Sequence, residues 1–372
     1  MLHWELLECD EDLADMLADA KGRKAVAVDT EFMRRNTFFP QPALLQLCFE
    51  ETAWLIDPLG IEDLDPLIKL MEDPGIVKVL HSASEDLEVF QQWLGVLPQP
   101  LFDTQRAAAI VGRGFGLGYR ALVAEIEGVD LPKGETRSDW LQRPLTDSQC
   151  DYAALDVTHL LNAWRVLDAE CESQGKREWV LGDGSDASAS LASNTSGYYK
   201  RIKSAWKLNP RALGVLSAVG DWRERTARRK NKPRGWIIDD QACMQLAHHN
   251  PGNLSELQRS IDLPPPAIRQ YGEDLLDLLA QQRDLPDEEM PEPLGKPLDA
   301  RQRGQVKQLK SAVKLIAGEQ AVTPEILLTG KDYEMLVREA HGESIDPPLA
   351  WKGWRDQLVI APLRALLAGE KL

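Results

Sequence analysis

The sequence has no long apolar run and few cysteines. No stretch of its 372 residues approaches the roughly 20 apolar residues that a helix needs to cross a bilayer, so we expect no membrane-spanning segment. The first residues lack a basic start followed by an apolar core, so no secretory signal is expected. The five cysteines are widely spaced and form no Cys-x-x-Cys pair, which argues against a zinc site and fits reduced thiols. These absences predict a cytoplasmic protein that has no membrane partner.

The chain also lacks a positive net charge. A net charge of −16 argues against generic nucleic-acid binding, although binding depends on local patches. One patch is strongly basic: residues 198–234 are rich in Lys and Arg, and only Asp221 and Glu224 oppose them. Such a run is often only a solvated helix face, but the one-sided imbalance favours contact with phosphates. Candidate phosphate contacts in this patch are Lys200, Arg228 and Arg229.

Length and composition indicate a globular protein of two or three domains, with an apolar fraction of 43 %. Apolar, β-branched runs predict strands, and amphipathic patterns predict helices. Two of the links between strands are short, so some pairs are antiparallel, and we expect a mixed sheet flanked by helices. The expected strands are 25–32, 43–50, 53–57 and 76–80, and the expected helices are about 84–94, 104–111, 117–126 and 147–171.

The rest of the chain is predicted to be helical. Residues 182–197 are rich in Gly, Ser, Asp and Ala, which is typical of a flexible connector. An acidic, Pro-rich stretch at 284–298 separates the last helical unit from the one before it. The expected segments are an α/β domain at 1–180, a linker at 181–197, a helical domain at 198–283, a linker at 284–298 and a second helical domain at 299–372.

Three acidic clusters carry the chemistry, and the first contains Asp29 and Glu31. These two residues close the apolar run Ala25–Val28, and both point to the same face because side chains alternate along a strand. Neighbouring carboxylates at the end of a buried strand repel each other and lose solvation, which is tolerable when a cation lies between them. A divalent-metal site is therefore the leading hypothesis.

The other two clusters lie on predicted helices. Asp86 follows Ser82-Ala-Ser-Glu85, which fits a capping box, and would lie in the first helical turn. Tyr152 and Asp156 are four residues apart on one helix face, and the capping box Thr146-Asp-Ser-Gln149 marks the start of their helix. Each cluster alone has a structural explanation, namely a solvated acid at a helix start or a half-buried tyrosine beside an exposed aspartate. Their occurrence together favours a shared site.

Together the clusters resemble the three motifs of the DEDD superfamily of 3′→5′ exonucleases, in its tyrosine branch. The matching segments are Val28-Asp-Thr-Glu-Phe32, His81-Ser-Ala-Ser-Glu-Asp86 and Tyr152-Ala-Ala-Leu-Asp156. The resemblance implies an RNase H-like fold and two divalent cations, Mg²⁺ or Mn²⁺, held by Asp29, Glu31, Asp86 and Asp156. Tyr152 would position the attacking water. Carboxylate oxygens suit such ions, and two ions can stabilise both oxygens of an in-line displacement at phosphorus.

The resemblance covers nearly the whole chain. Residues 133–145 resemble the segment that precedes the last motif in the ribonuclease D subgroup. Within them, Arg137 and Arg143 are candidate phosphate contacts, and packing of Trp140 is the plain alternative. Segments at 206–210 and 221–225 resemble the HRDC domain, a small helical nucleic-acid-binding module, and 299–372 would be a second, more divergent one. An α/β exonuclease domain followed by two all-α HRDC domains is the layout of the ribonuclease D family.

The implied function is that of a metal-dependent 3′→5′ exoribonuclease that releases nucleoside 5′-monophosphates. The resemblance points to maturation of tRNA 3′ ends and processing of other small stable RNAs, with RNA as the partner. We expect a monomer because no coiled coil or unused apolar helix stripe is evident. A DNA exonuclease would use the same motifs, and no residue marks a contact to a 2′-hydroxyl. A non-catalytic RNA-binding adaptor is the alternative from another class, and the complete carboxylate set argues against it.

Overall fold

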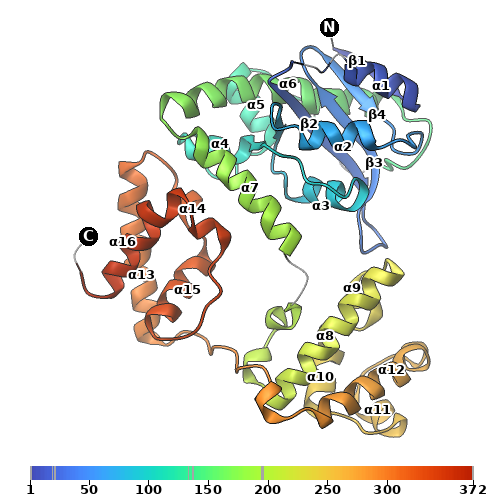
Figure 1. The fold of residues 1–372 in the computed structure, drawn as a ribbon, viewed down its shortest axis with the longest axis vertical. Helices are drawn as coiled ribbons and strands as arrows, with labels where there is room; N and C mark the ends of the chain where they lie inside the picture. The colour runs from blue at the N-terminus through green and yellow to red at the C-terminus, as the bar shows by residue number, and fades with distance from the viewer. Residues whose placement is uncertain are drawn as a thin grey trace. The chain divides into compact units, whose positions relative to one another are not determined.

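The chain forms two compact units in the computed structural model, which describes residues 2–370 except 19, 21, 133, 136, 137 and 194–196 (Figure 1). Unit 1 consists of Met1–Met33, Pro40–Ser193 and Leu298–Leu372, and unit 2 of Arg34–Phe39 and Asn194–Pro297. Among the described residues, no helix has the length and apolar character that crossing a membrane requires.

Unit 1 contains a mixed six-stranded sheet, which confirms the predicted fold class. The strand order is β1-β4-β3-β2-β5-β6, with β3 antiparallel to both of its neighbours and the other pairs parallel. The two edge strands, β1 and β6, were not predicted from the sequence. The strands are β1 (His3–Leu7), β2 (Ala25–Met33), β3 (Gln41–Cys48), β4 (Thr52–Ile56), β5 (Val77–Leu80) and β6 (Leu101–Asp103).

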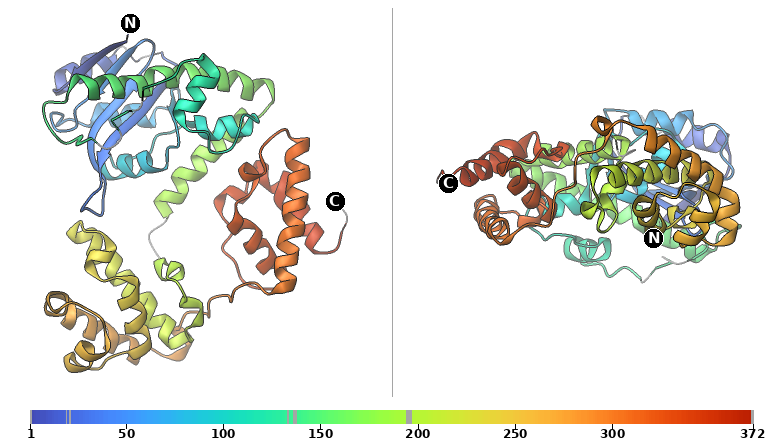
Figure 2. Two further views of the ribbon diagram at one scale, coloured as in Figure 1. Left: turned by 180° about the vertical axis from the view of Figure 1, so that it is seen from behind. Right: turned by 90° about the horizontal axis from the view of Figure 1, so that it is seen from below.

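Helices cover both faces of this sheet (Figures 1 and 2). Helix α6 packs on the face that carries Ala27 of β2, and α3 packs on the face that carries Val28. This alternation follows from the two-residue period of a strand, so each face of β2 builds a different core. The helices of the first part of unit 1 are α1 (Asp10–Ala18), α2 (Asp65–Glu72), α3 (Ser84–Trp93), α4 (Thr104–Ile110), α5 (Tyr119–Glu127), α6 (Asp147–Ser173) and α7 (Arg177–Ser193).

The predicted capping box at Ser82 and Glu85 is wrong. Helix α3 begins at Ser84, and Ser82 adopts a left-handed backbone with a φ of 61°. Asp103, at the end of β6, serves the start of α3 instead. Its carboxylate accepts the backbone N–H groups of Ser82 at 3.0 Å and of Ala83 at 3.1 Å. The carboxylate that anchors the chain just before α3 therefore comes from a neighbouring strand, which no local pattern could indicate.

The predicted flexible connector at 181–197 is wrong up to Ser193, because these residues belong to helix α7. The Gly, Ser and Ala content serves close packing: a Cβ at Gly184 would collide with the backbone of Leu101 in β6. Asp183 on the same helix is buried and paired with two arginines. The composition that suggested flexibility instead lets α7 approach the sheet.

Residues 298–372 fold as part of unit 1. Their helices are α13 (Ala300–Glu319), α14 (Pro324–Leu327), α15 (Gly330–Ala340) and α16 (Ala361–Leu367), with a 3₁₀ turn at Leu349–Trp351 and a π-helical turn at Asp356–Ile360. One hydrophobic core joins this region to α4, α6 and α7. Trp354 stacks on Trp179 of α7, with ring centroids 4.3 Å apart. Lys176 also donates to the backbone oxygen of Gln320 at 2.7 Å.

Unit 2 is helical around a core of its own. Trp222 of α8 lies in this core and packs edge-to-face on Tyr271 of α12, with ring centroids 5.5 Å apart. The loop 34–39 belongs to this unit, and the backbone N–H of Phe38 donates to Asn231 at 3.0 Å. The helices are α8 (Pro210–Lys230), α9 (Arg234–Ile237), α10 (Asp240–His249), α11 (Leu254–Ser260) and α12 (Pro265–Asp284), with 3₁₀ turns at Tyr198–Arg201, Ala205–Lys207 and Asp287–Glu289.

Candidate active site

Three of the predicted carboxyl groups meet on the α6 face of the sheet. One oxygen atom from each of Asp29, Glu31 and Asp156 lies within 4.8 Å of the other two. Asp29 and Glu31 project from alternate positions of β2, and Asp156 comes from α6, which packs against that strand. Three hard oxygen donors at this spacing fit a divalent cation such as Mg²⁺ or Mn²⁺.

Helix α6 aligns Tyr152 with Asp156 one turn apart. Its start confirms the predicted capping box, since Thr146 accepts the backbone N–H of Gln149 and the Gln149 side chain accepts the backbone N–H of Thr146. The Tyr152 hydroxyl hydrogen-bonds to the Asp156 carboxyl group. The local start signal thus fixes which turn of α6 faces the carboxylates.

Asp86 reaches the cluster from the opposite side of β2. Thr30 points to the α3 face of the strand, and its hydroxyl donates to Asp86 at 2.5 Å. Asp86 is 8 % exposed, so it is not a solvated helix-start acid. It lies outside the group of three yet close enough to raise the pKa values of Asp29 and Glu31. Thr30 was not among the predicted site residues, and its signal in the sequence is its place between two acidic residues.

Burial raises the pKa of all four carboxyl groups. The pKa of Glu31 rises to about 9, and those of Asp86 and Asp156 rise to about 7, with desolvation as the first cause in each case. Burial also raises the pKa of Asp29 well above its usual range, and the neighbouring acids add to this rise. Without a cation the cluster therefore retains protons near neutral pH, and a bound cation would displace them.

Tyr152 remains protonated in this environment. Burial and the charges of Asp156, Glu31 and Asp29 raise the pKa of its phenol, so it acts as a hydrogen-bonding group and not as a base. The backbone at Gly134 presses against its ring, since a methyl group at Gly134 would overlap the aromatic carbons. The ring is thus held in place by the segment that precedes α6.

A cavity of about 730 Å³ opens beside the carboxyl groups. Asp29, Asp156 and Tyr152 line it together with His81 and Tyr119, and several leucines complete the wall. The His81 Nδ1 atom lies 2.9 Å from the Thr104 hydroxyl, and burial lowers the pKa of the ring. A largely apolar cavity with a polar end is typical of a small-molecule or nucleoside site.

Comparisons with known proteins decide the family. A model of the 3′-5′ exonuclease domain matches residues 4–172, and a model of the HRDC domain matches residues 212–279. Ribonuclease D of Pseudomonas paraeruginosa is 42 % identical over 350 residues, which cover 93 % of both chains. Ribonuclease D of Escherichia coli is 35 % identical over 372 residues, which cover 98 % of this chain and 99 % of that one. This chain belongs to the ribonuclease D family.

The solved structures agree with this assignment. The crystal structure of Escherichia coli RNase D, described as an exoribonuclease involved in structured RNA processing, matches the chain with a TM-score of 0.91. The match covers 100 % of both chains at 34 % identity. Membership of the ribonuclease D family confirms the predicted 3′→5′ exoribonuclease activity and the predicted HRDC domain.

The structure argues against one predicted RNA contact of this ribonuclease D family member. The Arg143 guanidinium forms a bidentate ion pair with the Asp57 carboxylate and donates to the backbone oxygens of Ala43 and Trp140. Its donors are therefore used inside the fold, and Trp140 is buried as the plain alternative predicted. Arg137 lies outside the described residues.

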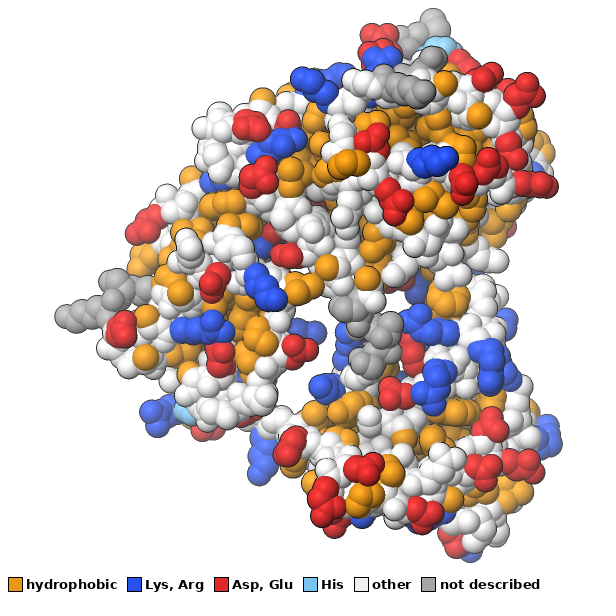
Figure 3. Space-filling view, viewed as in Figure 1, with side chains coloured by type: hydrophobic (Ala, Val, Ile, Leu, Met, Phe, Trp, Pro, Cys, Tyr) orange, Lys and Arg blue, Asp and Glu red, His pale blue; other side chains and the backbone are white. Residues whose placement is uncertain are grey.

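The basic stretch of unit 2 divides into structural and exposed cations. Arg228 pairs with Glu224 at 2.9 Å and lies over the ring of Phe38 at 4.9 Å. Lys200 and Arg229 are exposed. Figure 3 shows Lys and Arg side chains on the part of unit 2 that α8 and α9 form. The family's HRDC model covers α8 from residue 212, so these cations lie within or just before that domain.

Proposed function

We propose that the chain hydrolyses RNA from its 3′ end by a two-metal mechanism at the carboxyl cluster. Asp29, Glu31, Asp86 and Asp156 would hold two divalent cations, Mg²⁺ or Mn²⁺. The observation that carries this proposal is the convergence of three half-buried carboxyl groups within 4.8 Å, with the buried carboxyl group of Asp86 close by. Bound cations would supply Lewis acidity and an activated water for displacement at phosphorus.

The protein's own groups orient the reactants. The protonated phenol of Tyr152 holds the water in line, and the adjoining cavity takes the terminal nucleoside. The water oxygen bonds to the terminal phosphorus while the bond to the 3′-oxygen of the preceding nucleotide breaks. The products are a nucleoside 5′-monophosphate and an RNA with a new 3′-hydroxyl.

The substrates we propose are precursors of tRNA and other small stable RNAs with 3′ extensions. The support is similarity to the Escherichia coli enzyme, which is described as acting in structured RNA processing. Exposed cations of unit 2 bind the phosphates of the RNA body, and they include Lys200, Lys203, Arg229 and Lys232. Residues 299–372 serve as a second, HRDC-like domain. The protein works as a monomer in the cytoplasm, where its free cysteines stay reduced.

The test is digestion of a 3′-extended tRNA by the purified full-length protein. We expect stepwise shortening with release of nucleoside 5′-monophosphates, loss of activity in EDTA and recovery with Mn²⁺. Asp156→Asn should lower the rate by about 10²-fold or more, because it removes a carboxylate from the reacting centre. Asp151→Asn is the matched control, since that exposed residue of α6 accepts a hydrogen bond from Trp4 and is not part of the carboxyl cluster.

Two outcomes would contradict the proposal. Hydrolysis by Asp156→Asn at the wild-type rate would show that the cluster is not the catalytic centre. Faster digestion of a matched DNA 3′ end than of the RNA would support the DNA exonuclease instead.

A further inference from the structure

Gln46 is buried beside Asp29 without a hydrogen-bond partner. It lies on β3 with 0 % exposure, and among the described residues neither its side-chain nitrogen nor its side-chain oxygen has a hydrogen-bond partner. In the antiparallel β2–β3 pair it stands directly opposite Asp29. Opposite residues place their side chains on the same face, with Cβ atoms about 4.5–5.5 Å apart. Gln46 is therefore the cross-strand neighbour of Asp29 on the face that holds the carboxyl cluster.

The other neighbours of Gln46 on this face are apolar. Leu44 and Cys48 occupy the alternate positions of β3, and Leu55 stands opposite Gln46 on β4. All three are buried, and α6 covers them. An apolar side chain would suit these surroundings better than an amide, because a buried polar group without a partner destabilises the fold. A glutamine at this position therefore calls for a functional reason.

Among the described residues, no side chain donates a hydrogen bond to Asp29, although Glu31, Asp86 and Asp156 lie close to it. A carboxylate that binds a metal through one oxygen usually accepts a hydrogen bond on its other oxygen. The adjacent amide of Gln46 offers such a donor and, being neutral, does not compete with a cation as Lys or Arg would.

We propose that Gln46 is a positioning residue for Asp29. In the metal-bound protein its side-chain amide would donate to the Asp29 carboxylate, directly or through one water, and hold that carboxylate in the orientation that binds a divalent cation. The inference rests on the proposed function, because it requires Asp29 to be a metal ligand. This role explains why position 46 carries an amide although its packed neighbours favour an apolar side chain.

Gln46→Met separates this role from a purely structural one. Methionine has nearly the same shape and no strong donor, so both roles predict that the metal-free protein melts at the same or a higher temperature. Only the positioning role predicts weaker metal binding, by about 10- to 100-fold in the Kd for Mn²⁺. Calorimetric titration of the full-length protein with Mn²⁺ measures this Kd without any substrate.

Two further variants complete the test. Ser188→Ala is the matched control, because the Ser188 hydroxyl is also buried and unpartnered among the described residues but lies on α7, which packs against the edge strand β6 and helix α4. It should leave the Kd unchanged. Gln46→Asn keeps the amide but withdraws it by one methylene, so it should also weaken Mn²⁺ binding, and it serves if Gln46→Met does not fold.

The outcomes distinguish the inference from the proposed function. Wild-type affinity for Mn²⁺ in both Gln46 variants, with binding lost in Asp29→Asn, would overturn the role of Gln46 alone. Binding by Asp29→Asn as tight as that of the wild type would overturn the metal site itself. Weaker binding in the Gln46 variants with an unchanged Ser188→Ala would support the inference.

Discussion

At the residue scale, the carboxyl cluster lowers the stability of the metal-free protein at neutral pH. In the unfolded chain these groups ionise near pH 4. In the folded chain the pKa values of Asp86 and Asp156 are about 7 and that of Glu31 is about 9. Between these limits the folded state binds more protons than the unfolded state, so the free energy of unfolding falls as pH rises. The protonated carboxyl groups stabilise the folded state at low pH, and this contribution is lost as the pH rises through the raised pKa values.

This linkage predicts how the melting temperature depends on pH. The metal-free protein should melt at a lower temperature at pH 9 than at pH 6. Asp29→Asn should flatten this dependence and raise the metal-free Tm at pH 8 by about 2–4 °C or more, since about 1 kcal/mol shifts Tm by that amount in a unit of this size. The same variant should lose hydrolysis and the rise in Tm that Mn²⁺ gives the wild type.

Scanning calorimetry in EDTA, with and without excess Mn²⁺, measures both effects. A metal-free wild type whose Tm rises steadily from pH 6 to pH 9 would contradict the assigned direction of the pKa shifts.

At the element scale, the sequence predicted those features that local pattern controls. The apolar run of β2 and the alternation of Asp29 and Glu31 are local, and so is the capping box of α6. The contributions of Thr30 and Gln46 were not predicted, because the contact of each one depends on how β2 packs against another element. The predictions of a capping box at the start of α3 and of a flexible connector in place of α7 failed for the same reason. Their partners, Asp103 and Arg355, lie far away in the sequence.

At the same scale, the backbone around Gly134 holds the ring of Tyr152 in place. A methyl group there would displace the Tyr152 ring, so Gly134→Ala should lower kcat by about 10²-fold, the scale for a misplaced catalytic group, with little change in KM for RNA. Single-turnover hydrolysis of a short RNA measures the effect.

A double-mutant cycle isolates the contact with the ring. In a Tyr152→Ala background no ring remains, so adding Gly134→Ala should change the residual rate very little. Gly182→Ala on α7 is the matched control, because no atom lies within 4 Å of the added carbon. Equal losses from Gly134→Ala in both backgrounds would show that the glycine acts by another route.

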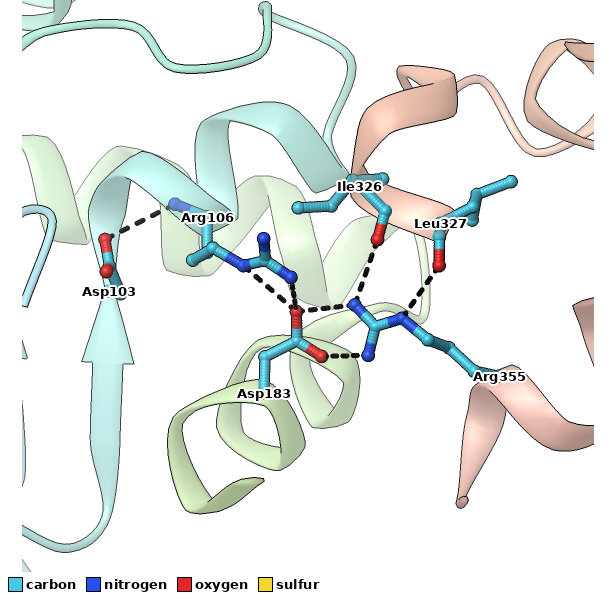
Figure 4. A network of polar contacts seen from close by, with 6 residues as sticks. All are labelled: Asp103, Arg106, Asp183, Ile326, Leu327 and Arg355. Carbon is cyan, nitrogen blue, oxygen red and sulfur yellow. Dashed lines mark hydrogen bonds and ion pairs between the residues drawn. The ribbon is translucent and has the colours of Figure 1, made fainter. Parts of the chain in front are cut away.

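At the scale of the whole molecule, a buried ionic network joins residues 298–372 to the rest of unit 1. Asp183 of α7 pairs with Arg355, with 2.8 Å between Oδ2 and Nη2, and also with Arg106 of α4 (Figure 4). Arg355 donates as well to the backbone oxygens of Ile326 and Leu327. These contacts satisfy a carboxylate that is otherwise enclosed by protein, and Arg355 and Arg106 keep the pKa of Asp183 below its usual value.

Removing Arg355 should therefore destabilise unit 1. Arg355→Met leaves Asp183 with Arg106 alone and two carbonyls unpaired, and removing one partner of a buried pair costs about 3–5 kcal/mol. Because Arg106 is retained, we expect a loss near the lower end of this energy range, which corresponds to a fall in Tm of roughly 6–12 °C.

Arg364→Met is the control. Its pair with Glu339 is on the surface, with the Arg364 side chain 43 % exposed, and such pairs contribute about 0–1 kcal/mol. Equal Tm values for the two variants would show that the network does not hold the C-terminal region in place. A larger fall for Arg355→Met, with hydrolysis retained at 25 °C, would show that residues 298–372 are a structural part of the catalytic unit.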